Sequence, residues 1–151
     1  MTIIRPSVAN LDRERLRTTV LDNFEHGFNC AEAIFVAFAE HLNEDLSLMR
    51  IATPFGAGIG GRRDLCGILI GGAMVVGLLY GRTDPDDLGS KRVAYGMAAQ
   101  YYRWFKVEKK QLHCSEIVPG KFTGHTANCV CLMDEAQAVL VDIVAHPSGS
   151  S

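Results

Sequence analysis

The sequence predicts an all-α fold: a single compact helical domain, residues 1–146, with about five to six helices around a central Gly-rich helix, and a disordered tail, residues 147–151. Several segments repeat apolar residues with the helical period. No segment alternates with period two for long enough to form a convincing strand. The chain has 151 residues, the length of one ordinary domain, and 48% of them are hydrophobic, which is enough for a core.

The first two predicted helices are separated by Gly27, a residue that suits the left-handed position after a helix end. The first helix begins near Asn10, and its apolar face carries Leu16, Val20, Leu21 and Phe24. The second begins at Asn29, because Asn29 and Glu32 have the spacing of a capping box. Its apolar face carries Ile34, Phe35, Phe38 and Leu42.

A short helix is expected over residues 46–52. The stretch 55–61, with sequence FGAGIGG, is too rich in glycine for a stable helix and is expected to be a flexible loop that runs on to Asp64. Asp64 is predicted to cap the next helix, because its side chain can accept hydrogen bonds from the first free N–H groups.

That next helix, residues 65–80, is predicted to lie at the centre of the fold. It carries several glycines, each of which costs up to about 1 kcal/mol relative to Ala inside a helix. Gly67 and Gly71 lie one turn apart, and the same spacing recurs along Ala73, Gly77 and Gly81. Such smooth faces let another backbone approach closely.

A long helix is predicted from Asp84 to about residue 110, with Asp84 as its cap and Pro85 at its first position. Its aromatic residues occupy several faces and indicate core packing together with a subunit contact: Tyr95, Tyr101, Tyr102, Trp104 and Phe105. A loop with Pro119, Gly120 and Gly124 should follow, and the last helix is expected over residues 128–145.

Charge and hydropathy exclude several classes of function. The net charge is −2 with no basic face, so no nucleic-acid partner is expected. The longest uncharged apolar run, residues 65–80, is shorter than the roughly 20 residues of a membrane span, so no membrane is expected. The first twenty residues lack an apolar signal segment, which favours a cytoplasmic location. The partners that remain are a redox partner that the sequence does not identify and further copies of the chain in a homo-oligomer.

Three of the five cysteines closely follow a candidate helix N-cap. They are Cys30, Cys66 and Cys129, which follow Asn29, Asp64 and Asn128. The first turn of a helix has unpaired N–H groups and the positive end of the helix dipole. Both favour thiolate over thiol, so these positions predict a lowered thiol pKa.

An odd number of cysteines in a chain expected in a reducing compartment does not indicate a disulfide framework. Reactive thiols, metal ligands and inert core residues remain as alternatives, and the last fits Cys131 best. The chain has no Cys-x-x-Cys pair, so the spacing is poor for an ordinary zinc site. His113 and His125, which lie near Cys114 and Cys129, are candidate ligands or proton donors, although an exposed loop histidine is the commoner outcome.

The chain resembles the C_GCAxxG_C_C family, which is described as redox-active and has no defined reaction. The resemblance runs from about Gly27 to Leu140, and its motifs are FNCAEA at 28–33, FGAGIGG at 55–61, CGILIGGAM at 66–74, CSEI at 114–117 and Cys129. Ile68 departs from the Ala usual in the family, and Cys131 is an extra cysteine.

The resemblance implies an all-helical domain with a four-cysteine site. Cys30, Cys66, Cys114 and Cys129 would act either as redox thiols or as ligands of an iron–sulfur cluster or another metal. The glycine loop would lie around this site, with Gly58, Gly60, Gly61 and Gly67 as cofactor-binding residues.

The leading hypothesis is therefore a small redox or electron-transfer protein. The alternatives are a non-catalytic helical binding or assembly module and a structural zinc site. The first hypothesis predicts that the N-termini that carry Cys30, Cys66 and Cys129 converge, with Cys114 approaching from the loop after the long helix.

Overall fold

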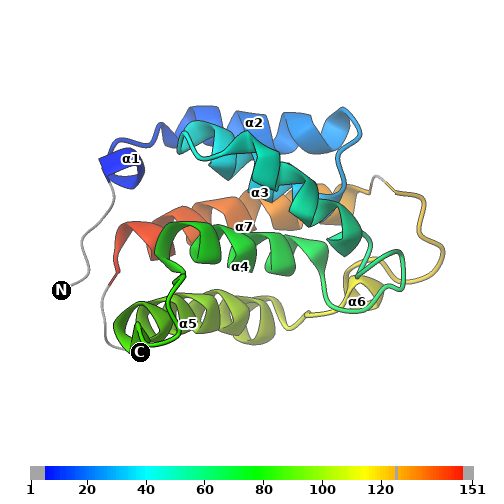
Figure 1. Ribbon diagram of the computed structural model, residues 1–151. Coiled ribbons are helices and arrows are strands. Elements are labelled where there is room, and N and C mark those ends of the chain that lie inside the picture. The colour runs from blue at the N-terminus through cyan, green and yellow to red at the C-terminus, as the bar shows by residue number, and fades with distance from the viewer. Residues whose placement is uncertain (1–5, 125, 148–151) are drawn as a thin grey trace.

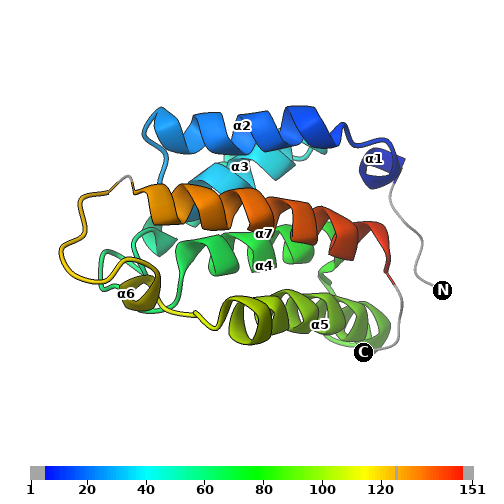
Figure 2. The same cartoon turned by 180° about the vertical axis from the view of Figure 1, so that it is seen from behind.

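The computed structural model describes residues 6–124 and 126–147, and all the expected tail except Pro147 lies outside them. Within these ranges the chain is all-α, with seven α-helices, one 3₁₀-helix, one π-helix and no strand (Figures 1 and 2). The elements are α1 (Pro6–Ala9), α2 (Arg13–Glu25), α3 (Cys30–His41), η1 (Leu46–Phe55), α4 (Gly67–Tyr80), α5 (Leu88–Arg103), η2 (Trp104–Lys109), α6 (Cys114–Ile117) and α7 (Ala127–Ala145). The single-turn helices α1 and α6 have no counterpart in the sequence prediction.

Helices α2 and α3 form an antiparallel pair joined at Gly27, which takes the predicted left-handed conformation at φ 110°. The predicted capping box at the start of α3 is present. Asn29 Oδ1 accepts from the Glu32 N–H at 2.9 Å, and Glu32 Oε1 accepts from the Asn29 N–H at 3.0 Å. The first turn of α3 is therefore held by two reciprocal hydrogen bonds.

Helix α4 lies inside the bundle and packs against α3, α5 and α7, as predicted for the central helix (Figure 1). Gly71 makes this packing close, since a Cβ there would overlap the backbone of Ala31 in α3. On another face, a Cβ at Gly72 would overlap the ring of Tyr101 in α5. The second predicted smooth face is not used in this way, because a Cβ at Gly77 would meet no atom within 4 Å.

The long helix begins later than the sequence predicted. Asp87, not Asp84, caps α5, and its side chain accepts from the Ser90 N–H at 3.0 Å. Asp84 instead closes a turn by accepting from the Asp86 N–H at 2.9 Å. Near its end the helix widens into the π-helix η2, which the helical periodicity did not predict.

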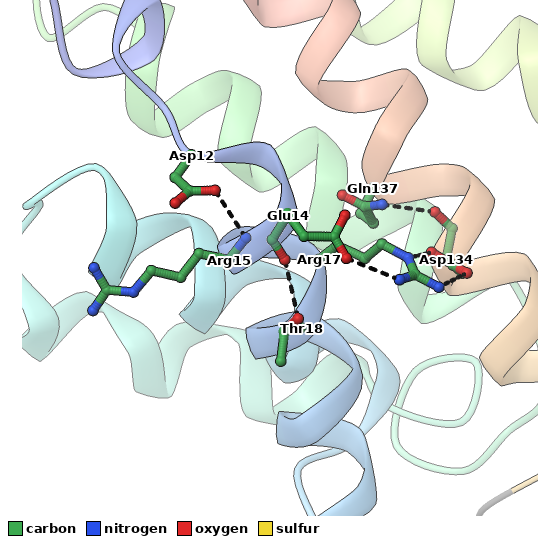
Figure 3. Close-up of polar contacts among 7 residues, drawn as sticks. All are labelled: Asp12, Glu14, Arg15, Arg17, Thr18, Asp134 and Gln137. Atoms are coloured by element: carbon green, nitrogen blue, oxygen red, sulfur yellow. Dashed lines mark hydrogen bonds and ion pairs between the residues drawn. The ribbon is translucent and has the colours of Figure 1, made fainter.

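Helix α7 lies in front of α4 in the view of Figure 2, and it packs against both α2 and α4. A bidentate ion pair joins these two helices: Arg17 Nε and Nη2 donate to the two carboxylate oxygens of Asp134 at 2.6 and 2.9 Å (Figure 3). Among the described residues, no helix is both long and apolar enough to cross a membrane.

Candidate four-cysteine site

One end of the bundle contains a cavity of about 620 Å³. Its walls include Cys30, Cys66, Cys114 and Cys129, which come from four separate segments of the chain. The first residues of α4 and α7 lie at this end together with α6, and the short α2–α3 connection brings the first residue of α3 there as well (Figure 1). The predicted convergence of helix N-termini is therefore present.

Cys30 is the first residue of α3 and is half-buried. Its neighbour Asn29 has a second role besides capping, since Asn29 Nδ2 donates to the Thr53 carbonyl at 3.0 Å. Thr53 Oγ1 in turn donates to Glu32 at 2.8 Å. These contacts fasten η1 to the start of α3, so the position of Cys30 depends on residues 20 or more apart in the sequence.

Cys66 and Cys114 are held by a short antiparallel pairing of their own segments. The Cys66 N–H donates to the Leu112 carbonyl at 2.8 Å, and the Cys114 N–H donates to the Asp64 carbonyl at 2.7 Å. Both side chains are buried, at 4% and 6% exposure. The prediction that Asp64 caps this helix is wrong: α4 begins at Gly67 with Cys66 as its N-cap, because the backbone of residues 64–66 is extended in this pairing.

Cys129 lies in the first turn of α7 and is 7% exposed. The predicted cap Asn128 is also wrong. Thr126 is the N-cap, and its hydroxyl accepts from the Cys129 N–H at 3.2 Å. Asn128 instead donates to the carbonyl of Ile117 at 2.8 Å and so ties α7 to α6. Cys131 is exposed and lines a separate, smaller depression, so it points away from Cys129 as predicted. The prediction that Cys131 is an inert core residue is wrong, because its side chain lies on the surface.

The thiols interact electrostatically across the cavity. Burial is the largest effect, and it raises the pKa of Cys30 and Cys129 above the usual thiol value and that of Cys66 to about 12. Negative charge on neighbouring cysteines raises these pKa values further. The amides of Ile68 and Leu69 oppose the rise at Cys66, although its side chain makes no capping hydrogen bond. The predicted lowering of the thiol pKa is therefore wrong, because desolvation outweighs the helix N-terminus.

The four glycines expected near a cofactor lie in different surroundings. Gly67 lines the cavity, and a Cβ there would overlap Cys30 Sγ. Gly58 packs against the backbone of residues 63 and 64, whereas Gly60 and Gly61 are exposed and a Cβ at either would meet no atom within 4 Å. Gly56 and Ala57, from the same loop, line the cavity.

His113, the residue before Cys114, contacts two carboxylates and does not line the cavity. His113 Nδ1 lies 2.8 Å from the carboxylate of Glu116, and its Nε2 lies 3.6 Å from Asp64. The other candidate histidine, His125, lies outside the described residues. Three aromatic residues also line the cavity, and the sequence analysis did not place them at the site: Phe24, Phe28 and Phe122. Phe122 gave no local signal, because it lies in a loop far from Cys30 and Cys66 in the sequence.

A comparison with protein families matches residues 28–143 to the family described as "Putative redox-active protein (C_GCAxxG_C_C)". The chain belongs to the C_GCAxxG_C_C family. The match begins two residues before Cys30 and ends on α7, so all four cavity cysteines lie inside it. Among curated proteins and among solved structures, none matches the chain.

The described residues contain no group of three or more His, Cys, Asp or Glu side chains placed to hold a single metal ion. The four thiols line one cavity, but no three of them are placed for a single metal ion. A zinc ion needs its sulfur ligands at about 2.3 Å, which this arrangement does not provide.

Proposed function

We propose that this C_GCAxxG_C_C protein is an electron-transfer protein in which Cys30, Cys66, Cys114 and Cys129 hold an iron–sulfur cluster. The observation that carries the proposal is that four cysteines from four distant segments line one cavity. Free cysteine is often an inert core residue. If the cysteines were inert, four of the five would not be expected to line one cavity. Cys131, which lies in the same helix turn as Cys129, is outside that cavity.

The donor set suits a cluster better than a single ion. Four cysteine thiolates are the usual ligands of an iron–sulfur cluster. Ligands spread around a cavity of about 620 Å³ fit this arrangement, whereas a mononuclear zinc site needs them within reach of one point. When bound, the cluster would supply reversible one-electron oxidation and reduction.

The protein's own residues provide burial, charge balance and access. Three of the thiols have a raised pKa, so the cavity disfavours several thiolates unless a cation accompanies them. Iron provides that positive charge. Apolar residues such as Ile68, Ile117 and Phe122 line the cavity and would limit the entry of water, and Cys30 is the one of the four cysteines that is only half-buried.

Anaerobic purification followed by iron and sulfide analysis tests the proposal. The wild-type protein should be brown and contain iron and acid-labile sulfide. The single Ser variants at positions 30, 66, 114 and 129 should each lose most of both. Cys131→Ser is the matched control, because it removes a thiol two residues from Cys129 that does not line the cavity, and it should retain wild-type iron.

Other outcomes would each support a different function. A colourless protein that forms a reversible disulfide among the four cysteines would indicate thiol–disulfide exchange. Stoichiometric zinc without a redox response would indicate a structural site. A metal-free protein whose oligomeric state and partners survive replacement of all four cysteines would indicate an assembly module.

A further inference from the structure

Arg63 lies three residues before Cys66 and contacts two other segments of the site. Its Nη1 donates to the Gly120 carbonyl, and its Nη2 donates to the Cys114 carbonyl at 3.4 Å. The guanidinium also lies over the ring of Phe122, 5.6 Å from the ring centroid. One side chain therefore joins the segment that carries Cys66 to α6 and to the segment that leads toward Cys129.

The backbone of Arg63 is fixed by the same surroundings. Its N–H donates to the Ala57 carbonyl at 2.9 Å, and its carbonyl accepts from the Ser115 N–H at 3.2 Å. Its φ of 62° lies in the left-handed region, which is uncommon for a residue other than glycine. Residues held in such conformations are kept there by their neighbours, so the direction of this side chain is set by the glycine loop and α6.

The contacts of Arg63 extend to the wall of the cavity. Phe122, Val118 and Gly124 all line the cavity, and they belong to the segment that Arg63 holds at Gly120. Arg63 Nε is buried and has no hydrogen-bond partner among the described residues. The positive charge also lies beside one of the four cavity cysteines, since Arg63 Nη2 donates to the carbonyl of Cys114.

We propose that Arg63 is a positioning residue of the four-cysteine site, which fastens residues 118–124 over the cavity and presents a positive charge to the thiolates. The second part of this proposal, the positive charge presented to the thiolates, rests on the proposed function, because it requires a site that is oxidised and reduced. A reduced centre is more negative than an oxidised one. A fixed cation nearby favours the reduced state and raises the reduction potential.

The experiment compares Arg63→Gln, Arg63→Lys and Arg62→Gln with the wild type. Arg62→Gln is the control for charge, because Arg62 is the adjacent residue and its side chain is exposed. The first measurement is amide hydrogen exchange in the metal-free protein, which needs no cluster. The second is the reduction potential of the anaerobically purified protein, measured by a mediated titration.

Arg63→Gln should increase exchange in residues 118–124 by about tenfold or more, because it removes a charge-assisted hydrogen bond to the Gly120 carbonyl. It should also shift the potential to a more negative value. Arg63→Lys keeps the positive charge but loses the planar guanidinium and its paired N–H donors. Its reduction potential should therefore lie close to that of the wild type, while amide exchange in residues 118–124 should stay as fast as in Arg63→Gln. Arg62→Gln should change neither quantity.

The two proposals fail in different ways. If the wild type binds no iron, the proposed function fails, and the exchange measurement still decides whether Arg63 fastens the segment. If Arg63→Gln and Arg62→Gln give the same exchange and the same potential, the role of Arg63 is overturned. Should Arg63→Gln not fold, Arg63→Lys decides instead, and wild-type exchange in residues 118–124 would overturn the fastening role.

Discussion

Gly67 of α4 lies directly against the sulfur of Cys30 in α3, so closely that a Cβ at position 67 would overlap that sulfur. The same Cβ would also meet the Phe55 carbonyl oxygen. The absence of a side chain at Gly67 therefore lets the starts of α3 and α4, which carry Cys30 and Cys66, pack against the end of η1 at one wall of the cavity.

Replacement of Gly67 by Ala should lower stability by about 1–3 kcal/mol, the usual cost of overpacking a tight contact. It should also reduce the iron content, because the displaced sulfur belongs to a proposed ligand. Chemical denaturation and iron analysis measure the two effects. Gly77→Ala is the matched control in the same helix, since a Cβ there meets no atom, and it should be neutral or stabilising by up to about 1 kcal/mol. Equal stability of the two variants would contradict this account.

The elements that local signals specify were predicted well from the sequence. Asn29 and Glu32 form the predicted capping box, and the Gly71 face of α4 makes the predicted close helix contact. The grouping of Cys30, Cys66 and Cys129 also followed from local positions near helix starts. The signals for these features are local, since a cap, a glycine spacing and a helix start are each read from residues within a turn or two of one another.

The features that the sequence did not predict depend on distant contacts. Asp64 is not a cap because its backbone pairs with the segment before α6, about 50 residues away. The pKa of Cys66 rises because the whole fold buries the thiol, although its position at a helix start favours the thiolate. Arg63 gave no signal because its contacts, Gly120 and Phe122, come from a loop far along the chain.

Tyr101 connects α5 to the start of α4 by a buried hydrogen bond, in which its hydroxyl donates to the Ile68 carbonyl at 2.9 Å. The side chain is fully buried. Tyr101→Phe should lower the free energy of unfolding by about 1 kcal/mol, the net value of a typical hydrogen bond. Tyr102→Phe is the control, because Tyr102 is 39% exposed, and its change should remain within about 0.5 kcal/mol. A neutral Tyr101→Phe would mean that this bond does not contribute to stability.

The Arg17–Asp134 ion pair should make stability depend on acid pH (Figure 3). The hydrogen bond and charge of Arg17 lower the pKa of Asp134. A carboxylate with a lowered folded-state pKa stabilises the protein above its unfolded pKa of about 3.9, and this contribution is lost as the pH falls through the folded value. Asp134→Asn should therefore be less stable than wild type at pH 7, and the difference should shrink below about pH 4. Thermal unfolding across this range measures it.

Asp142→Asn provides the comparison for that measurement. Asp142 also lies on α7 and pairs with Arg13 of α2, but through one hydrogen bond and with side chains 63% and 53% exposed. The Arg17–Asp134 pair has two hydrogen bonds, and its side chains are 43% and 34% exposed. Exposed pairs are screened by solvent and contribute little. If both variants lost the same amount of stability with the same pH dependence, the cause would be the change in the net charge of the protein and not the Arg17–Asp134 contact.

The burial of the cavity thiols predicts an order of alkylation in the reduced, metal-free protein. Cys131 is exposed and should react first with iodoacetamide, whereas Cys66, at 4% exposure, should react last. Burial raises the pKa of Cys66 to about 12, so very little of this thiol is thiolate at pH 8, and the thiolate is the reactive form. Its rate should rise about tenfold for each pH unit between pH 8 and 10 while the protein remains folded. Mass spectrometry of timed samples identifies the modified residues.

The same raised pKa values predict a loss of stability in alkali. Thiols with a raised folded-state pKa remain protonated in the folded protein, while in the unfolded chain they lose protons above about pH 8.5. Their stabilising contribution is therefore complete below that pH and declines as the pH rises toward the folded values. The metal-free wild type should lose stability between pH 8.5 and about pH 10.5, and the variant with Ser at positions 30, 66 and 129 should lose less, because it lacks these three titrating groups. An identical loss of stability in both proteins would show that burial of the cavity thiols does not cause the decline. In the alkylation experiment, a rate for Cys66 equal to that of Cys131 at pH 8 would show that the cavity does not keep this thiol from water.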